Sequence, residues 1–174
     1  QAVDNLSQNK IGALIAVERE VGLAGVVEAG TTLHANVSAE LIQTIFWPGS
    51  VLHDLGMVIR RDKIIAAGVQ FPLAEGEEST QTLGSRHRAA IGLTQEADCL
   101  VVVVSEETGA ISLAERGQLI RNLSLDHLRT MLRRGLSDTR RPDEPAPRAI
   151  PDDPDPDPSD TKKQDPDSPD KSAA

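Results

Sequence analysis

The sequence predicts an α/β domain built on a mixed central β-sheet flanked by helices, followed by a disordered tail. Apolar runs typical of strands interleave with amphipathic stretches typical of helices, and short turns often join adjacent strands. These short turns argue against a purely parallel sheet, in which each crossover needs a dozen or more residues. The composition also changes near the C-terminus. We therefore expect one domain over residues 1–136 and a tail over residues 137–174.

The expected strands are apolar runs rich in β-branched residues. They are a buried strand at 11–18, two strands within 56–71 joined by a tight turn at 61–62, and two strands within 99–115 joined by the turn "EETG". Polar residues predict a loop over 72–82 and a further turn at 116–117.

The expected helices show apolar positions at helical spacing or a residue suited to a helix end. Ser38, Ser85 and Ser124 are suitable N-caps for helices over 39–46, 85–95 and 125–136, and Pro48 and Gly49 end the first of these. A short helix within 20–30 is expected to close at Gly30.

The last 33 residues carry most of the negative charge. The chain has a net charge of -9, and residues 142–174 hold ten Asp or Glu against four Lys or Arg, with nine of the eleven prolines. Such a segment buries too little apolar surface to offset its chain entropy, which predicts disorder. It is a solvated tail or, as a separate hypothesis, an adaptor that recruits regulatory protein partners.

Composition also limits the partners and the compartment. Cys99 is the single cysteine and precedes an apolar run, so we expect a core residue in a reducing compartment. No stretch approaches the ~20 apolar residues of a membrane helix, and no signal peptide is visible. With no basic stripe and few aromatic residues, nucleic-acid binding is not expected. Because the chain starts at Gln1, we expect a processed or excised cytoplasmic piece.

A cationic cluster, "GSRHRAA", follows the polar loop. If Ser85 caps the predicted helix, then Arg86, His87 and Arg88 lie in its first turn, where free N–H groups and the helix dipole favour an anion. Arginines there oppose the dipole unless an anion neutralises them, and a polyphosphate would do so through bidentate contacts. The alternative is two solvated arginines and a packed histidine.

An acidic residue, Asp54, follows His53 at the edge of an apolar strand and precedes Leu55 and Gly56. An acid there can hold a divalent cation or take a proton from a hydroxyl, and a glycine lets a ligand approach the backbone. The alternative is a turn aspartate that caps backbone N–H groups.

Three polar residues, Ser105, Glu106 and Glu107, end the most apolar run in the chain. Ligand sites in open sheets favour the carboxyl ends of strands. The alternative is a plain hairpin turn in which Gly109 supplies positive φ. The P-loop, GxGxxG, HExxH and CxxC signatures are absent, and His34 and His127 are expected to be structural or surface residues.

These three stretches, with "IGALIAVERE", "SAELIQTIF", "KIIAAG" and "PLAE" in the same order, resemble the diadenylate cyclase (DAC) domain family. Its members are bacterial enzymes that make cyclic di-AMP. The resemblance covers roughly residues 5–135. The N-terminal stretch is most similar to the membrane-anchored branch, which implies a parent protein anchored at the inner face of the cell membrane. This chain would touch a membrane only through an anchor it lacks.

The resemblance implies the DAC fold, ATP as substrate and a divalent metal, Mg²⁺, Mn²⁺ or another. Two domains meet face to face as a homodimer, so that each 3′-hydroxyl attacks the α-phosphate of the opposite ATP and two pyrophosphates leave. By this resemblance Asp54 is the catalytic acid and, with His53, the metal ligand. Residues 85–88, including the catalytic Arg86, His87 and Arg88, engage phosphates. Residues 105–107 lie near the nucleotide.

The sequence departs from the family's Asp-Gly-Ala motif, because Asp54 is followed by Leu55 and Gly56. Leu55 adds bulk where the family keeps the backbone open, and Gly56 is expected to restore the opening one residue later. Both remain candidate nucleotide-binding residues. The alternative function is a weak or inactive module of the same fold that binds ATP or cyclic di-AMP.

Overall fold

The computed structural model describes residues 1–19, 22–74 and 83–137. Its centre is one seven-stranded mixed sheet with strand order β2-β4-β3-β1-β5-β6-β7, in which β1 and β3 are parallel and the other neighbours are antiparallel. The strands are β1 (Ala13–Glu18), β2 (Thr31–Asn36), β3 (Gly56–Arg60), β4 (Lys63–Val69), β5 (Cys99–Val104), β6 (Ile111–Glu115) and β7 (Gln118–Ile120). The predicted mixed sheet is confirmed.

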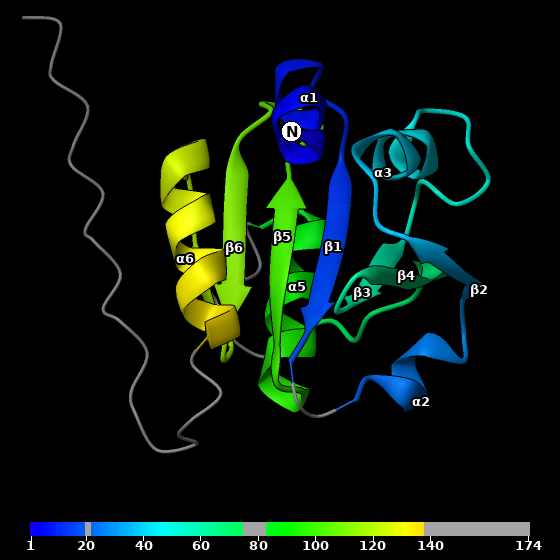
Figure 1. Cartoon of the computed structure of the whole chain (residues 1–174). Coiled ribbons are helices and arrows are strands. Elements are labelled where there is room, and N and C mark those ends of the chain that lie inside the picture. Colours follow the sequence, from blue (N-terminus) through cyan, green and yellow to red (C-terminus); the bar gives the residue numbers. More distant parts are fainter. Residues whose placement is uncertain (20–21, 75–82, 138–174) are drawn as a thin grey trace, which may run out of the picture.

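Helices cover both faces of this sheet, and Figure 1 shows α5 behind it and α6 in front. The helices are α1 (Ala2–Gln8), α2 (Ala24–Val27), α3 (Ala39–Phe46), α5 (Ser85–Glu96) and α6 (Leu125–Ser137). Two apolar cores result. Helices α1, α3 and α6 pack on one face, and α5 packs on the other.

Alternation along the central strands feeds both cores, since successive side chains of a strand point to opposite faces. In β5, Val102 and Val104 join the core under α1 and α3, whereas Val101 and Val103 join the core under α5. This two-sided burial explains why β1 and β5 are continuous apolar runs. Burying each side chain of this size contributes about 1.5–3 kcal/mol to the stability of the fold, so this run holds β5 firmly in the centre of the sheet.

Several predicted elements are confirmed and three were missed. The Ser38 side chain accepts a hydrogen bond from the Leu41 N–H, and the Ser124 side chain accepts one from the His127 N–H, so both act as N-caps. Three elements were not predicted: α1 and the two outer strands β2 and β7, whose exposed residues break the apolar alternation. The helix expected within 20–30 is shortened to α2, and residues 20–21 lie outside the described part.

One N-cap prediction was wrong. Gly84, not Ser85, is the N-cap of α5, and no side chain caps this helix. The Gly84 carbonyl accepts the N–H groups of His87 and Arg88, so Ser85 is the first residue of the helix and not its cap. The hydroxyl of Ser85 is therefore not used for capping.

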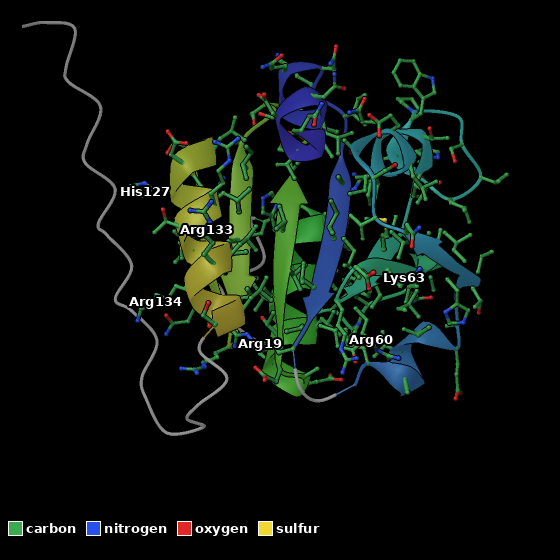
Figure 2. All side chains as sticks on the ribbon, in the orientation of Figure 1. Arg19, Arg60, Lys63, His127, Arg133 and Arg134 are labelled. Atoms are coloured by element: carbon green, nitrogen blue, oxygen red, sulfur yellow. The ribbon has the colours of Figure 1, made fainter. Side chains whose placement is uncertain are left out.

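Helix α6 is amphipathic. Leu128 is buried against the sheet, while His127, Arg133 and Arg134 are exposed on the outward side, as Figure 2 shows. None of the described helices is long and apolar enough to cross a membrane. The predicted acidic tail falls beyond residue 137, outside the described residues, and the domain boundary stays a prediction.

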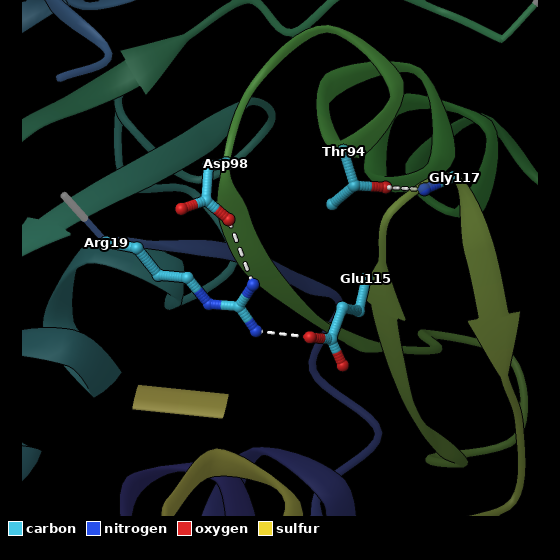
Figure 3. Close-up of polar contacts among 5 residues, drawn as sticks. All are labelled: Arg19, Thr94, Asp98, Glu115 and Gly117. Carbon is cyan, nitrogen blue, oxygen red and sulfur yellow. Dashed lines mark hydrogen bonds and ion pairs between the residues drawn. The ribbon is translucent and has the colours of Figure 1, made fainter. Parts of the chain in front are cut away.

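A buried arginine ties the strand ends on the side of the sheet where β1 finishes. The Arg19 side chain is only 3% exposed; it bonds Asp98, at 2.9 Å, and Glu115. Nearby, the Thr94 hydroxyl of α5 accepts a hydrogen bond from the Gly117 N–H at 3.1 Å. Figure 3 shows these contacts, which fasten α5 and the β6–β7 turn to the sheet.

Candidate active site

Topology brings the predicted site segments to one edge of the sheet. In the parallel pair of β1 and β3, Ile15 lies opposite Met57, and in the antiparallel pair of β1 and β5, Ala13 lies opposite Val104. The residues just before β3 and just after β5 therefore share an edge, with β1 between them. Neighbouring strands lie about 4.8 Å apart, so the backbones of β3 and β5 are separated by about 10 Å.

The N-terminus of α5 reaches the same edge beside Gly12, the residue before β1. A Cβ on Gly12 would lie 2.8 Å from Arg86 Cζ and 3.0 Å from Glu106 Oε2. Only a residue without a side chain leaves room for both groups. Gly12 is thus a site residue that the sequence analysis missed, although a glycine directly before a buried strand was the available signal.

An ion pair joins two of the predicted site segments. Arg86 Nη1 lies 2.7 Å from Glu106 Oε2, with the two side chains 17% and 62% exposed. The Arg86 Nε atom is buried and has no hydrogen-bond partner among the described residues. The arginine is therefore incompletely paired, and an exposed, displaceable carboxylate occupies the position of an anion.

His87 is held on the inner side of the first turn of α5. Its Nε2 lies 3.3 Å from the hydroxyl of Ser112, which is buried on β6. Burial, and secondly the positive charge of Arg121, lower the pKa of His87 below its usual value. These surroundings favour the neutral form of His87, which offers one ring nitrogen as donor and the other as acceptor.

A cavity of about 340 Å³ opens between α5 and the turn after β5. That volume falls in the range of small-molecule sites. The predicted residues that line it are Ser85, Arg86, His87, Ser105, Glu106 and Glu107, and the unpredicted polar ones are Thr108, Ser112 and Arg121. Positive φ at Gly109 allows the turn, as expected.

One predicted phosphate ligand, Arg88, is not among the residues that line this cavity. Successive residues of an α-helix are rotated by about 100°, so Arg86 and Arg88 project about 200° apart. Only Arg86 and His87 of the cationic cluster therefore bring ring or guanidinium nitrogens to the cavity.

The acidic stretch lies along the same sheet edge but outside the cavity walls. His53 Nε2 is 3.0 Å from Asp54 Oδ1, and the Asp54 side chain is 79% exposed. His53 Nδ1 faces the Ser50 carbonyl, which only accepts, so Nδ1 carries the proton. His53 Nε2 and the Asp54 carboxylate are then two acceptors in contact. A proton or a cation between them would stabilise this contact.

This donor set fits a divalent cation in part. An imidazole nitrogen and a carboxylate oxygen are adjacent, but the described residues contain no group of three or more His, Cys, Asp or Glu able to hold a metal. Mg²⁺ commonly uses one or two carboxylates together with substrate phosphates, so a two-residue set suits a cation that arrives with a nucleotide.

The expectation for Gly56 was wrong. A Cβ on Gly56 would lie 2.4 Å from Phe71 Cζ, so the Phe71 ring already covers this glycine and no opening to a ligand remains. Gly56 is buried at the start of β3, whereas the Leu55 side chain is 42% exposed. Glycine is needed here for packing against an aromatic ring.

Comparison with known proteins decides the family. Residues 1–119 match the DAC family, described as "DisA bacterial checkpoint controller nucleotide-binding". The chain belongs to the DAC family. As a DAC domain it is similar to the cyclic di-AMP synthase CdaA of Bacillus subtilis, with 40% identity over 132 residues, 76% of this chain and 48% of the relative. It is also similar to the diadenylate cyclase CdaS of Bacillus thuringiensis, with 46% identity over 118 residues, 68% of this chain and 59% of the relative.

Solved structures share the fold. DacA of Staphylococcus aureus, crystallised as a double mutant, matches this DAC domain with a TM-score of 0.75 and 39% identity, covering 78% of this chain and 90% of that one. A Bacillus cereus protein described as a hypothetical membrane spanning protein matches with a TM-score of 0.68 and 44% identity, covering 71% and 60%. The chain spans about half the length of the curated relatives it matches.

Proposed function

We propose that this DAC domain is a diadenylate cyclase that condenses two ATP molecules into cyclic di-AMP and two pyrophosphates. The observation that carries the proposal is the cavity at the start of α5, where Arg86 and His87 meet the turn after β5 on the sheet edge that also holds Asp54. The names of the relatives, cyclic di-AMP synthase and diadenylate cyclase, support it.

The polyphosphate is the group that the cavity suits best. The first turn of α5 has no side-chain cap and offers backbone N–H groups, the Arg86 side chain lines the cavity, and the hydroxyl of Ser85 takes no part in capping. Phosphoryl transfer depends mainly on positioning and on neutralising charge. We assign phosphate binding to these groups, with the Glu106 carboxylate displaced from Arg86 when the triphosphate enters.

In each half-reaction the 3′-oxygen of one ATP bonds to the α-phosphorus of the other. The bond from that phosphorus to the oxygen bridging to the β-phosphate breaks, and pyrophosphate leaves with the electron pair. We assign the proton of the 3′-hydroxyl to the Asp54 carboxylate, which is exposed and acceptor-only when ionised. Two such transfers close the ring.

A divalent cation, Mg²⁺ or Mn²⁺, would be held by His53 and Asp54 and would supply charge neutralisation at the phosphoryl oxygens when bound. His53 is oriented for this by its hydrogen bond to the Ser50 carbonyl, which leaves Nε2 as the ligand atom.

Two ATP molecules react only if two sites oppose each other, so the proposal includes a homodimer. Large apolar side chains surround Asp54 in sequence and are exposed: Trp47 at 61%, Val51 at 98% and Leu55 at 42%. Apolar groups gathered on the segment that carries the acid suit a surface that a second copy covers.

We further propose that the domain works on the cytoplasmic side of the membrane as part of an anchored protein. The match to a Bacillus cereus protein described as a hypothetical membrane spanning protein supports this location.

The deciding experiment incubates the chain with ATP and Mn²⁺ or Mg²⁺ and separates the nucleotides. We expect cyclic di-AMP and pyrophosphate in a ratio of one to two, with a specific rate that rises with protein concentration. Asp54→Asn should keep the fold and abolish turnover. The matched control is Asp62→Asn, in the turn between β3 and β4, at the other end of β3. ATP binding without product in the unaltered chain would refute the cyclase and leave a nucleotide-binding module.

A further inference from the structure

The cavity is lined by a second arginine that no sequence motif indicated. Arg121 follows β7 directly and lines the same cavity as Arg86 and His87. It is exposed, and no hydrogen bond or ion pair of its side chain occurs within the described residues. Its five N–H donors are therefore available toward a ligand in the cavity.

The other charged groups that line the cavity show why the unpaired guanidinium of Arg121 matters for binding an anion. Two guanidinium groups and two carboxylates line the cavity, those of Arg86, Arg121, Glu106 and Glu107. Glu106 is paired with Arg86, and the lowered pKa of His87 favours its uncharged form. Arg121 is thus the lining cation without a carboxylate partner among the described residues. A polyphosphate attracted into the cavity meets this free charge without first displacing a protein group.

The backbone on both sides of Arg121 is fixed. Ile120 pairs with Leu113 of β6, and the Leu123 N–H donates to the Ile111 carbonyl at 2.9 Å. The other end of the β6–β7 hairpin is bound to α5 by the hydrogen bond from the Gly117 N–H to Thr94 (Figure 3). The hairpin and the helix therefore fix the backbones that carry Arg121 and Arg86 around one cavity, which lowers the entropy lost when both bind one ligand.

We propose that Arg121 is a phosphate-binding residue of this site and binds the polyphosphate of ATP from the end of β7, while Arg86 binds it from the start of α5. This inference rests on the proposed function and adds to it a binding residue outside the "SRHR" cluster. It also explains how the cavity presents two guanidinium groups although Arg88 projects elsewhere. Burial lowers the pKa of His87 and the charge of Arg121 lowers it further, so Arg121 acts electrostatically on the first turn of α5.

The test compares Arg121→Gln with the matched control Arg133→Gln on the outward side of α6, seen in Figure 2. Titration calorimetry measures the binding of ATP, of inorganic pyrophosphate and of adenosine. Loss of a charge-assisted contact should weaken ATP and pyrophosphate binding about 10- to 100-fold in Arg121→Gln. Adenosine binding should not change, and Arg121→Lys should recover part of the loss. Arg133→Gln should match the unaltered chain for all three probes.

A second readout does not depend on turnover. Removing the positive charge at residue 121 should raise the pKa of His87, followed by NMR, and removing the charge at residue 133 should leave it unchanged. Equal ATP and pyrophosphate affinities in Arg121→Gln and the unaltered chain would overturn the assignment even if cyclic di-AMP is made. Arg121-dependent binding without cyclic di-AMP would support it while refuting the cyclase. Failure of the unaltered chain to bind ATP or pyrophosphate would overturn both.

Discussion

Gly12 offers a sharp test of the site, because its substitution by alanine strains one functional contact and little else. The added Cβ would lie 2.8 Å from Arg86 Cζ, 2.9 Å from Arg86 Nη1 and 3.0 Å from Glu106 Oε2. All three atoms are ends of flexible side chains, so we expect Arg86 and Glu106 to move and the backbone to stay. The 2.7 Å ion pair should then lengthen or break.

The two expected magnitudes differ. Because Glu106 is 62% exposed, the ion pair contributes at most about 1 kcal/mol to folding. Replacing glycine by alanine returns about 0.4–1 kcal/mol through the unfolded chain where the backbone tolerates it. The melting temperature should therefore hardly change. A displaced Arg86 loses charge-assisted phosphate contacts of about 1.5–3 kcal/mol, which corresponds to roughly 10- to 100-fold weaker ATP binding.

Calorimetric ATP titration and thermal unfolding measure both effects. Gly25→Ala is the matched control, since a Cβ at Gly25 would meet nothing within 4 Å. If Gly12→Ala binds ATP as tightly as the unaltered chain, Arg86 does not bind phosphate from this position. If it unfolds many degrees earlier, the strain falls on the sheet rather than on the site, and the reasoning fails.

Three further predictions follow from buried polar groups. Because the pKa of His87 is lowered in the folded chain, the unfolded chain binds this proton more readily. The contribution of His87 to the free energy of unfolding is therefore complete above about pH 6.5 and declines as the pH falls toward the folded pKa. His87→Gln should flatten that part of a pH–stability curve, and an unchanged curve would contradict the prediction. Thr94→Val should cost about 1–3 kcal/mol in urea unfolding, because the Gly117 N–H loses its acceptor; a neutral effect would show that another acceptor replaces it. Arg19→Met should destabilise the fold by about 1–3 kcal/mol, because its two partly exposed carboxylate partners lose charge-assisted hydrogen bonds; a more stable variant would mean that desolvation of Arg19 outweighs its ion pairs.

Sequence patterns predicted the parts of the fold that depend on local physics. Apolar runs located β1 and β5 because both faces of these strands are buried, and capping chemistry located the starts of α3 and α6. The outer strand β2 could not be found this way. Its burial comes from one neighbour only, and His34 breaks its regularity with a φ of 49°.

The site was only partly predictable for a related reason. The charged residues around Arg86 and Glu106 are visible in the sequence. Their ion pair beside Gly12, however, depends on the strand order, which no local pattern encodes. Arg121 follows a three-residue strand that was itself missed. The error at Gly56 had another cause, because an aromatic ring fifteen residues away in the sequence fills the space.

The contact between Arg86 and Glu106 gives the site its own competitor for an anionic ligand. An anion that binds Arg86 must displace a carboxylate that belongs to the same chain and is therefore present at high effective concentration. A ligand with a single charge gains too little binding free energy when it replaces Glu106 at Arg86. Each added phosphate accepts hydrogen bonds from further N–H donors of the site. The occupancy of the site should therefore rise steeply from nucleoside monophosphate to triphosphate. Chloride or acetate at cellular concentrations should not displace Glu106 from Arg86.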